Sequence, residues 1–131
     1  MARQVLLDTE LVLLRLDPFE RAVIMTRTSA DLPRSVEALR RFFDALVDAV
    51  SEVDRPSHSF IIDSRDTVGR NDEAFETVKR EYEEKLFGGF RKVSVVLRTE
   101  IGRLQVQRYN DILHENEMQV FPSVDDALEK H

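Results

Sequence analysis

Short apolar runs that alternate with longer stretches of helical periodicity are the feature that most restricts the fold of this chain. The apolar runs have the length of β-strands and occur at 5–7, 11–14, 22–25, 60–62, 93–97 and 118–121. From residue 31 onward, each gap between runs carries apolar residues three or four positions apart, which is the spacing of one helix face. Parallel strands need such helical crossovers, so the alternation predicts an α/β domain with one mainly parallel sheet.

The first part of the chain has the pattern of an antiparallel hairpin. The runs at 11–14 and 22–25 are separated by Asp17-Pro18, a pair that favours a type I turn. The run at 5–7 is compatible with a short leading strand. We therefore expect an antiparallel N-terminal hairpin, helices packed on the sheet, and the overall order ββαβαβαβα.

Four helices are predicted between and after the later strands. Asp31-Leu32-Pro33 is a helix-start signal, and the helix after it carries the clearest apolar stripe, formed by Val36, Leu39, Phe43, Leu46, Val50 and Val53. A second helix runs from about Asp72 to Phe87 and stops at Gly88-Gly89. The remaining two are expected at about 101–113 and after Ser123, which has the chemistry of an N-cap.

Composition narrows the class of protein. A length of 131 residues suits a single domain spanning 1–131, and no stretch approaches the roughly 20 apolar residues of a membrane-spanning helix. The N-terminus lacks a complete signal-peptide pattern, and the absence of cysteine fits a reducing compartment, so we expect a cytoplasmic protein with no integral membrane association. A net charge of -6 argues against nucleic acid as a partner.

Two passages resemble a known superfamily. One is the apolar strand that ends in Ile62-Asp63 before a polar loop and a helix, and the other is the ending 120–128 with the sequence VFPSVDDAL. Together with the order of elements, they resemble the SpoIIAA-like branch of the STAS superfamily, which includes anti-sigma-factor antagonists. The resemblance implies a small, non-enzymatic regulatory domain that acts through protein–protein interaction and sometimes binds nucleotides or apolar molecules.

The resemblance also implies candidate phosphorylation sites. In STAS proteins that antagonise anti-sigma factors, a serine or threonine at the start of the helix after the central strand is phosphorylated, within an Asp-Ser-Ser/Thr-Gly-like passage. The matching passage here is 63–70, with the sequence DSRDTVGR, which makes Ser64 and Thr67 the candidates. A phosphate at a helix N-terminus would meet free N–H groups. The alternative is a polar loop whose hydroxyls bind nearby backbone groups.

The same loop contains the residues that we expect to form a recognition surface: Asp63, Asp66, Gly69 and Asp72. Three carboxylates near the end of a strand could hold a hard cation, but Asp63 as a strand end and Asp72 as a helix cap explain two of them structurally. The sequence has no nucleophile elbow, no glycine-rich phosphate loop and no paired histidines at helical spacing. We therefore predict no catalytic residues, no metal and no cofactor.

Three functional hypotheses remain open at this point. The leading one is a STAS-like interaction domain that binds a protein partner, another copy of the chain included, through the 63–72 loop and the helix after it. A second is a carrier or sensor with a small apolar or anionic ligand between sheet and helices, in a pocket lined by Phe42, Phe75 and Tyr109. A third is a metal-dependent enzyme that uses Asp63, Asp66 and Asp72.

Overall fold

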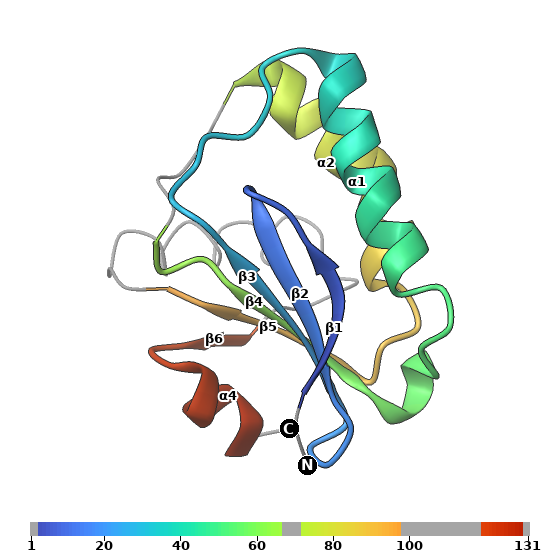
Figure 1. The fold of residues 1–131 in the computed structure, drawn as a ribbon, viewed down its shortest axis with the longest axis vertical. Coiled ribbons are helices and arrows are strands. Elements are labelled where there is room, and N and C mark those ends of the chain that lie inside the picture. The colour runs from blue at the N-terminus through green and yellow to red at the C-terminus, as the bar shows by residue number, and fades with distance from the viewer. Residues whose placement is uncertain (1–2, 67–71, 98–118, 130–131) are drawn as a thin grey trace.

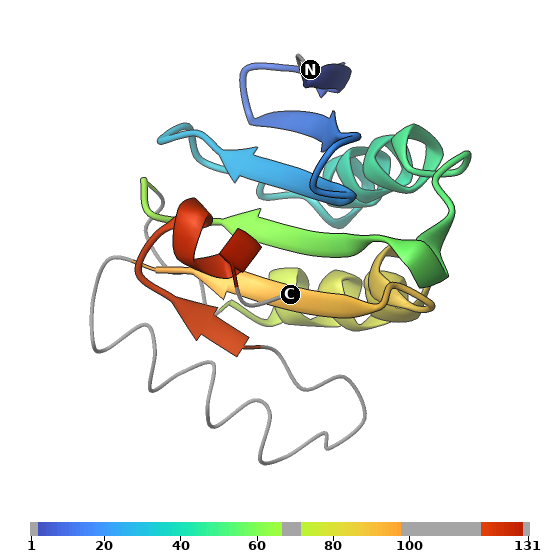
Figure 2. The same cartoon turned by 90° about the horizontal axis from the view of Figure 1, so that it is seen from below.

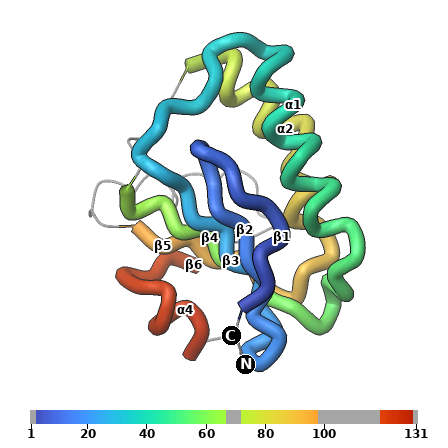
Figure 3. The backbone as a smooth tube through the Cα atoms, in the orientation of Figure 1, coloured from blue at the N-terminus to red at the C-terminus, as the bar shows by residue number. Residues whose placement is uncertain are grey.

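A six-stranded mixed sheet forms the centre of the computed structural model, which describes residues 3–66, 72–97 and 119–129 (Figure 1). The strands are β1 (Gln4–Asp8), β2 (Val12–Asp17), β3 (Ala22–Arg27), β4 (Ser59–Asp63), β5 (Lys92–Val96) and β6 (Gln119–Phe121). Their order in the sheet is their order in the chain, and the backbone can be followed across the sheet strand by strand (Figure 3). Strands β1 to β3 are antiparallel and β3 to β6 are parallel, which confirms the predicted α/β fold.

The N-terminal antiparallel part has three strands, because the run at 5–7 belongs to β1. The predicted turn at Asp17-Pro18 connects β2 to β3. The Asp17 carboxylate accepts hydrogen bonds from the backbone N–H groups of Phe19 at 3.1 Å and Glu20 at 2.9 Å. Arg21 closes the loop with a φ of 54°, in the left-handed region that side chains other than glycine seldom adopt. The two hydrogen bonds to the Asp17 carboxylate therefore stabilise the loop between β2 and β3.

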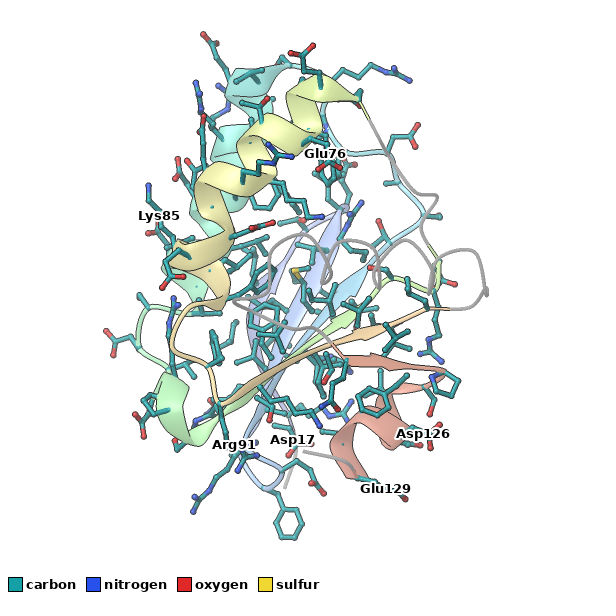
Figure 4. All side chains as sticks on the ribbon, turned by 180° about the vertical axis from the view of Figure 1, so that it is seen from behind. Asp17, Glu76, Lys85, Arg91, Asp126 and Glu129 are labelled. Atoms are coloured by element: carbon teal, nitrogen blue, oxygen red, sulfur yellow. The ribbon has the colours of Figure 1, made fainter. Side chains whose placement is uncertain are left out.

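Helices lie on both faces of the sheet (Figure 2). Helices α1 (Val36–Ala49) and α2 (Glu73–Phe87) pack against each other on one face, and α4 (Val124–Glu129) lies on the other. Seen from behind, Asp126 and Glu129 on α4 are far from Glu76 on α2 (Figure 4). None of the helices within 3–66, 72–97 and 119–129 is long and apolar enough to cross a membrane. The helix predicted at about 101–113 lies outside the described residues.

The start of α1 corrects the sequence prediction. The helix begins at Val36 instead of at the Asp31-Leu32-Pro33 signal, and Ser35 is its N-cap, with Oγ accepting from the N–H of Ala38 at 3.1 Å. Leu32 is buried in the main core while still in the connection from β3, so its packing keeps this segment non-helical. The helix ends at Ala49, and Val53 lies beyond it.

Among the residues that the structure describes, this layering produces two separate cores. The main core lies between the sheet and α1 and α2, where the predicted stripe residues Leu39, Phe43 and Leu46 are buried. The smaller core joins α4 to the opposite face, which we call the α4 face, and consists of Ala22, Ile24, Ile61, Val96, Ala127 and Leu128. Because side chains alternate along a strand, β3, β4 and β5 each contribute to both cores.

The C-terminal end of α2 is fastened to the connection before β4. The short 3-10 helix η1 (Arg55–Ser57) supplies Arg55, whose guanidinium donates to the carbonyl oxygens of Gly88 at 2.7 Å and Lys85 at 2.8 Å. The same guanidinium lies 5.0 Å from the centre of the Phe90 ring. Gly89, with a φ of 85°, provides the left-handed exit predicted for Gly88-Gly89.

Candidate functional site

The candidate site lies where β4 ends, on the edge of the sheet that also carries the ends of β5 and β6 (Figure 1). Asp63 is the last residue of β4 and is only 6% exposed. It pairs with Thr26 on β3 and Val96 on β5. The N–H of Ser64 donates to the carbonyl oxygen of Val96 at 3.0 Å, so the backbone stays in the sheet one residue beyond the strand. Open α/β sheets commonly place their functional groups at such an edge.

Arg65 holds the Asp63 carboxylate through two parallel hydrogen bonds. Nε of Arg65 donates to Oδ1 at 2.9 Å, and Nη2 donates to Oδ2 at 2.9 Å. The backbone N–H of Arg65 also approaches Oδ1, at 3.3 Å. The Asp63 side chain is 8% exposed and that of Arg65 is 39% exposed, so this ion pair joins a buried carboxylate to a guanidinium that water reaches. A bidentate pair of this kind fixes the direction in which the chain leaves β4.

The electrostatic balance keeps Asp63 ionised. Burial pushes the pKa of Asp63 upward, but the hydrogen bonds and charge of Arg65, with a contribution from the charge of Arg15, outweigh it and leave the pKa below its usual range. The hydrogen bond to Asp63 in turn raises the pKa of Arg65, and the charges of Asp66 and Asp125 act in the same direction. Arg65 therefore lies among three carboxylates, two from the loop and strand end and one from the first turn of α4.

A second arginine lies on the same face of the sheet. Arg15 on β2 pairs with Ile24 on β3, and Ile24 pairs with Ile61 on β4, so Arg15 shares the α4 face with Asp63. Two buried polar atoms in this region have no hydrogen-bond partner, Nε of Arg15 and Oγ1 of Thr26. We call Arg15, Thr26, Asp63 and Arg65 the β4-end cluster. Sequence reasoning missed both arginines, although Arg15 between the apolar residues Leu14 and Leu16 of β2 was a visible signal.

The structure gives the described residues of the predicted loop different local roles. Asp72 is the N-cap of α2, and its Oδ1 accepts from the N–H of Phe75 at 2.8 Å. Ser64 directly follows β4 and is not in the first turn of α2, so the helix N-terminus does not stabilise a phosphate on Ser64. Asp66 is exposed. Thr67 and Gly69 lie outside the described residues.

The aspartates do not assemble a metal centre. Across 3–66, 72–97 and 119–129, no three histidine or acidic side chains form a group that could hold a metal ion. Asp63 is engaged by Arg65, and Asp72 by the start of α2. The geometry of Asp63, Asp66 and Asp72 thus gives no support to the metal-dependent enzyme hypothesis.

Two of the three residues predicted to line a ligand pocket contribute to the main core. Phe42 and Phe75 are partly buried and pack against it. The Phe42 ring meets the Phe43 ring edge-on, with 5.4 Å between the ring centres. Tyr109 lies outside the described residues. These contacts fill space between helices and sheet and are those of ordinary packing.

Comparison with known proteins identifies the fold. No protein-family model matches the chain, and no curated protein matches its sequence at a significant level. The structure is similar to the crystal structure of an uncharacterized protein of the DUF3478 family from Shewanella loihica PV-4, which has a SpoIIAA-like fold. The TM-score is 0.67 at 14% sequence identity, over 99% of this chain and 95% of the other. The chain therefore has a SpoIIAA-like fold, as the sequence predicted.

Proposed function

We propose that this chain is a non-enzymatic, STAS-like interaction module that binds a protein partner through the surface at the end of β4 and is switched by phosphorylation of Ser64. The observation that carries the proposal is the position of Ser64 between the two members of a buried ion pair, Asp63 and Arg65. A modification at this residue is adjacent in the chain to both members of the ion pair that joins the loop to the end of β4.

Charge explains why a phosphate at Ser64 would act as a switch. A phosphoserine carries a charge of about -1.5 to -2 at neutral pH and three strong acceptor oxygens. It would repel the Asp63 carboxylate on one side and attract the Arg65 guanidinium on the other. The surface that carries Arg65, Asp66 and the first turn of α4 would change its charge, and with it its fit to a partner.

The ionisation of Asp63 supports a role without catalysis. A general base works best when its pKa lies near the operating pH, whereas Arg65 keeps the pKa of Asp63 below the usual range for a carboxyl group. Both carboxylate oxygens already accept hydrogen bonds from Arg65. The most buried acid at this edge is therefore arranged to hold the loop.

The test combines phosphosite mapping with quantitative partner capture. The tagged chain is recovered from its native cells after crosslinking, and the phosphosites and captured proteins are measured by mass spectrometry for wild type, S64A and S64E. S51E is the matched control, because Ser51 is exposed and lies in the connection between α1 and the start of β4, not at the end of β4 that carries Asp63. We expect phosphate on Ser64 and at least one partner whose recovery differs between S64A and S64E but not between wild type and S51E. Identical partner sets for S64A and S64E would contradict the proposal.

A further inference from the structure

A buried, unpartnered Nε atom on the partly exposed Arg15, next to a satisfied ion pair, points to a second arrangement of the β4-end cluster. Nε of Arg15 is buried and has no hydrogen-bond partner. On the same face of the sheet, both oxygens of Asp63 are taken by Arg65, whose side chain is 39% exposed. A buried donor without an acceptor is unfavourable, so the present arrangement satisfies the outer arginine while the inner one lacks a bond.

We propose that Asp63 has two alternative arginine partners: Arg65 in the arrangement described above, and Arg15 in a second one, in which Arg65 turns outward to a phosphate on Ser64. The inference rests on the proposed phosphorylation of Ser64 and supplies its mechanism. Arg65 then acts as the sensor of the phosphate, and Arg15 is the residue that keeps Asp63 paired after Arg65 has left.

The register of the sheet brings Arg15 within reach of Asp63. Arg15 pairs with Ile24, and Asp63 pairs with Thr26 two residues further along β3, so the two residues are offset by two strands and two positions. Spacings of about 4.8 Å between strands and about 3.3 Å per residue place their Cα atoms roughly 12 Å apart. An extended arginine and an aspartate can span that distance. The charge of Arg15 already lowers the pKa of Asp63, which agrees with this proximity.

The exchange avoids the main cost of breaking a buried ion pair. Removing one partner leaves an uncompensated charge inside the protein, which is strongly destabilising. Here Arg15 gains the hydrogen bond that it lacks at the moment when Arg65 gives one up. The phosphate competes well for Arg65 because it carries more charge than a carboxylate and because water reaches the Arg65 side chain.

The exchange would also alter the partner-facing surface. Arg65 is close enough to Asp66 and Asp125 for their charges to raise its pKa. When Arg65 turns toward the phosphate, the balance of charge around these two exposed residues changes. The switch would thus reach α4, which supplies Asp125, without any movement of the sheet.

NMR on chains with a genuine phosphoserine tests the exchange directly. Phosphoserine is installed at position 64, and at position 51 as the control, each with Arg15 and with R15M. The carboxyl resonance of Asp63 is titrated to obtain its pKa, and the Nε–H signals of Arg15 and Arg65 are recorded. With phosphate at 64, we expect R15M to raise the pKa of Asp63 by roughly one unit or more. With phosphate at 51, or none, the rise should be much smaller because Arg65 holds the carboxylate.

The arginine signals provide a readout that needs no substitution, so it holds even if R15M fails to fold. In the chain phosphorylated at 64, the Nε–H of Arg15 should become protected from solvent exchange and a contact from Arg65 to phosphorus should appear. An Arg65 signal that stays as in the unphosphorylated chain, or an equal effect of R15M with and without phosphate, would overturn the exchange. Neither readout depends on a partner or a kinase, so the arginine exchange and the proposed function can fail separately.

Discussion

Two bidentate arginine–carboxylate pairs in this protein differ mainly in their surroundings. In the pair between Arg65 and Asp63, the carboxylate is buried. In the pair between Arg40 on α1 and Glu81 on α2, the side chains are 46% and 40% exposed, although the shorter contact is again 2.9 Å. Water screens the second pair, and exposed ion pairs contribute little to stability even when their geometry is good. The two pairs therefore have similar hydrogen-bond geometry but differ in the burial of the carboxylate.

We expect R65A to lower the free energy of unfolding at neutral pH by about 1–2 kcal/mol, and R40A to leave it nearly unchanged. The effect of R65A stays below that of breaking a fully buried pair, because water reaches Arg65 and Arg15 remains nearby. Urea denaturation followed by circular dichroism measures both variants. A loss as large for R40A as for R65A would show that burial does not set the strength of these pairs.

The same pair predicts a pH dependence. The folded-state pKa of Asp63 lies below its ordinary value of 3.8, so its contribution to stability is complete above that value and is lost as the pH falls through the lowered folded pKa. The difference in stability between wild type and R65A should therefore be constant from pH 7 to about pH 5 and shrink in more acidic solution. Denaturation curves for both proteins at several pH values test this, and a difference that grows on acidification would contradict it.

At the scale of residues, the sequence predicts interactions between residues that are close together in the chain. Two helix caps are examples. Asp72 caps α2, and Ser123 caps α4, where its Oγ accepts from the N–H of Asp126 at 3.1 Å. Both caps can be predicted from the residue type and the helix that follows. The β4-end cluster cannot be predicted in this way, because only the registers of β2 with β3 and of β3 with β4 place Arg15 on the same face of the sheet as Asp63. In the sequence, Arg65 is one residue of the passage 63–70 that was compared with a phosphorylation motif. In the structure, it is the residue that holds Asp63.

At the scale of elements, apolar periodicity predicted most strands and helices, whereas the start of α1 depended on packing. Asp31-Leu32-Pro33 and Arg34-Ser35-Val36 both offer a polar residue before an apolar one. The burial of Leu32 in the main core decides between them, and burial is not visible from a short stretch of sequence. The third strand of the N-terminal part, β1, also depends on packing. It is short, and its register with β2 shifts between Val5 and Leu7.

Two alanine substitutions distinguish the true cap from the false one. We expect S35A to destabilise the protein by about 1 kcal/mol, because the N–H of Ala38 loses its acceptor. D31A should change stability by less than about 0.5 kcal/mol, as usual for an exposed position without a special role. Thermal and urea denaturation of both variants measure the difference. If D31A proved the more damaging, the helix would begin near Asp31 in solution.

At the scale of the whole molecule, the sheet separates a large core from a small one. Helices α1 and α2 cover one face with many apolar residues, whereas α4 adds only Ala127 and Leu128 to the buried part of the other. An element with few buried contacts opens at a lower free energy than the global unfolding reaction. Helix α4, next to the candidate site, is therefore the part of the described structure that we expect to detach first.

Hydrogen exchange with two leucine variants tests this order. L46A, in the main core, should lower the free energy of global unfolding by roughly 2–5 kcal/mol and speed exchange throughout the sheet. L128A should speed exchange in α4, including the Ala127 amide that bonds to Ser123, while the amides of β4 keep their protection. Equal loss of protection in β4 for the two variants would show that the cores unfold as one unit.

The strand order of the sheet has a consequence for how the protein is made. Each strand pairs with the one before it in the chain, so during translation a newly emerged strand finds its neighbour already in place. The parallel strands have to wait for their next partner, since α1 is synthesised between β3 and β4, and α2 between β4 and β5. At about 5–20 residues per second, the interval from Asp63 to Lys92 lasts roughly 2–6 s. For those seconds the open edge of β4, whose five residues are all buried in the folded protein, is exposed to chaperones or to another nascent chain.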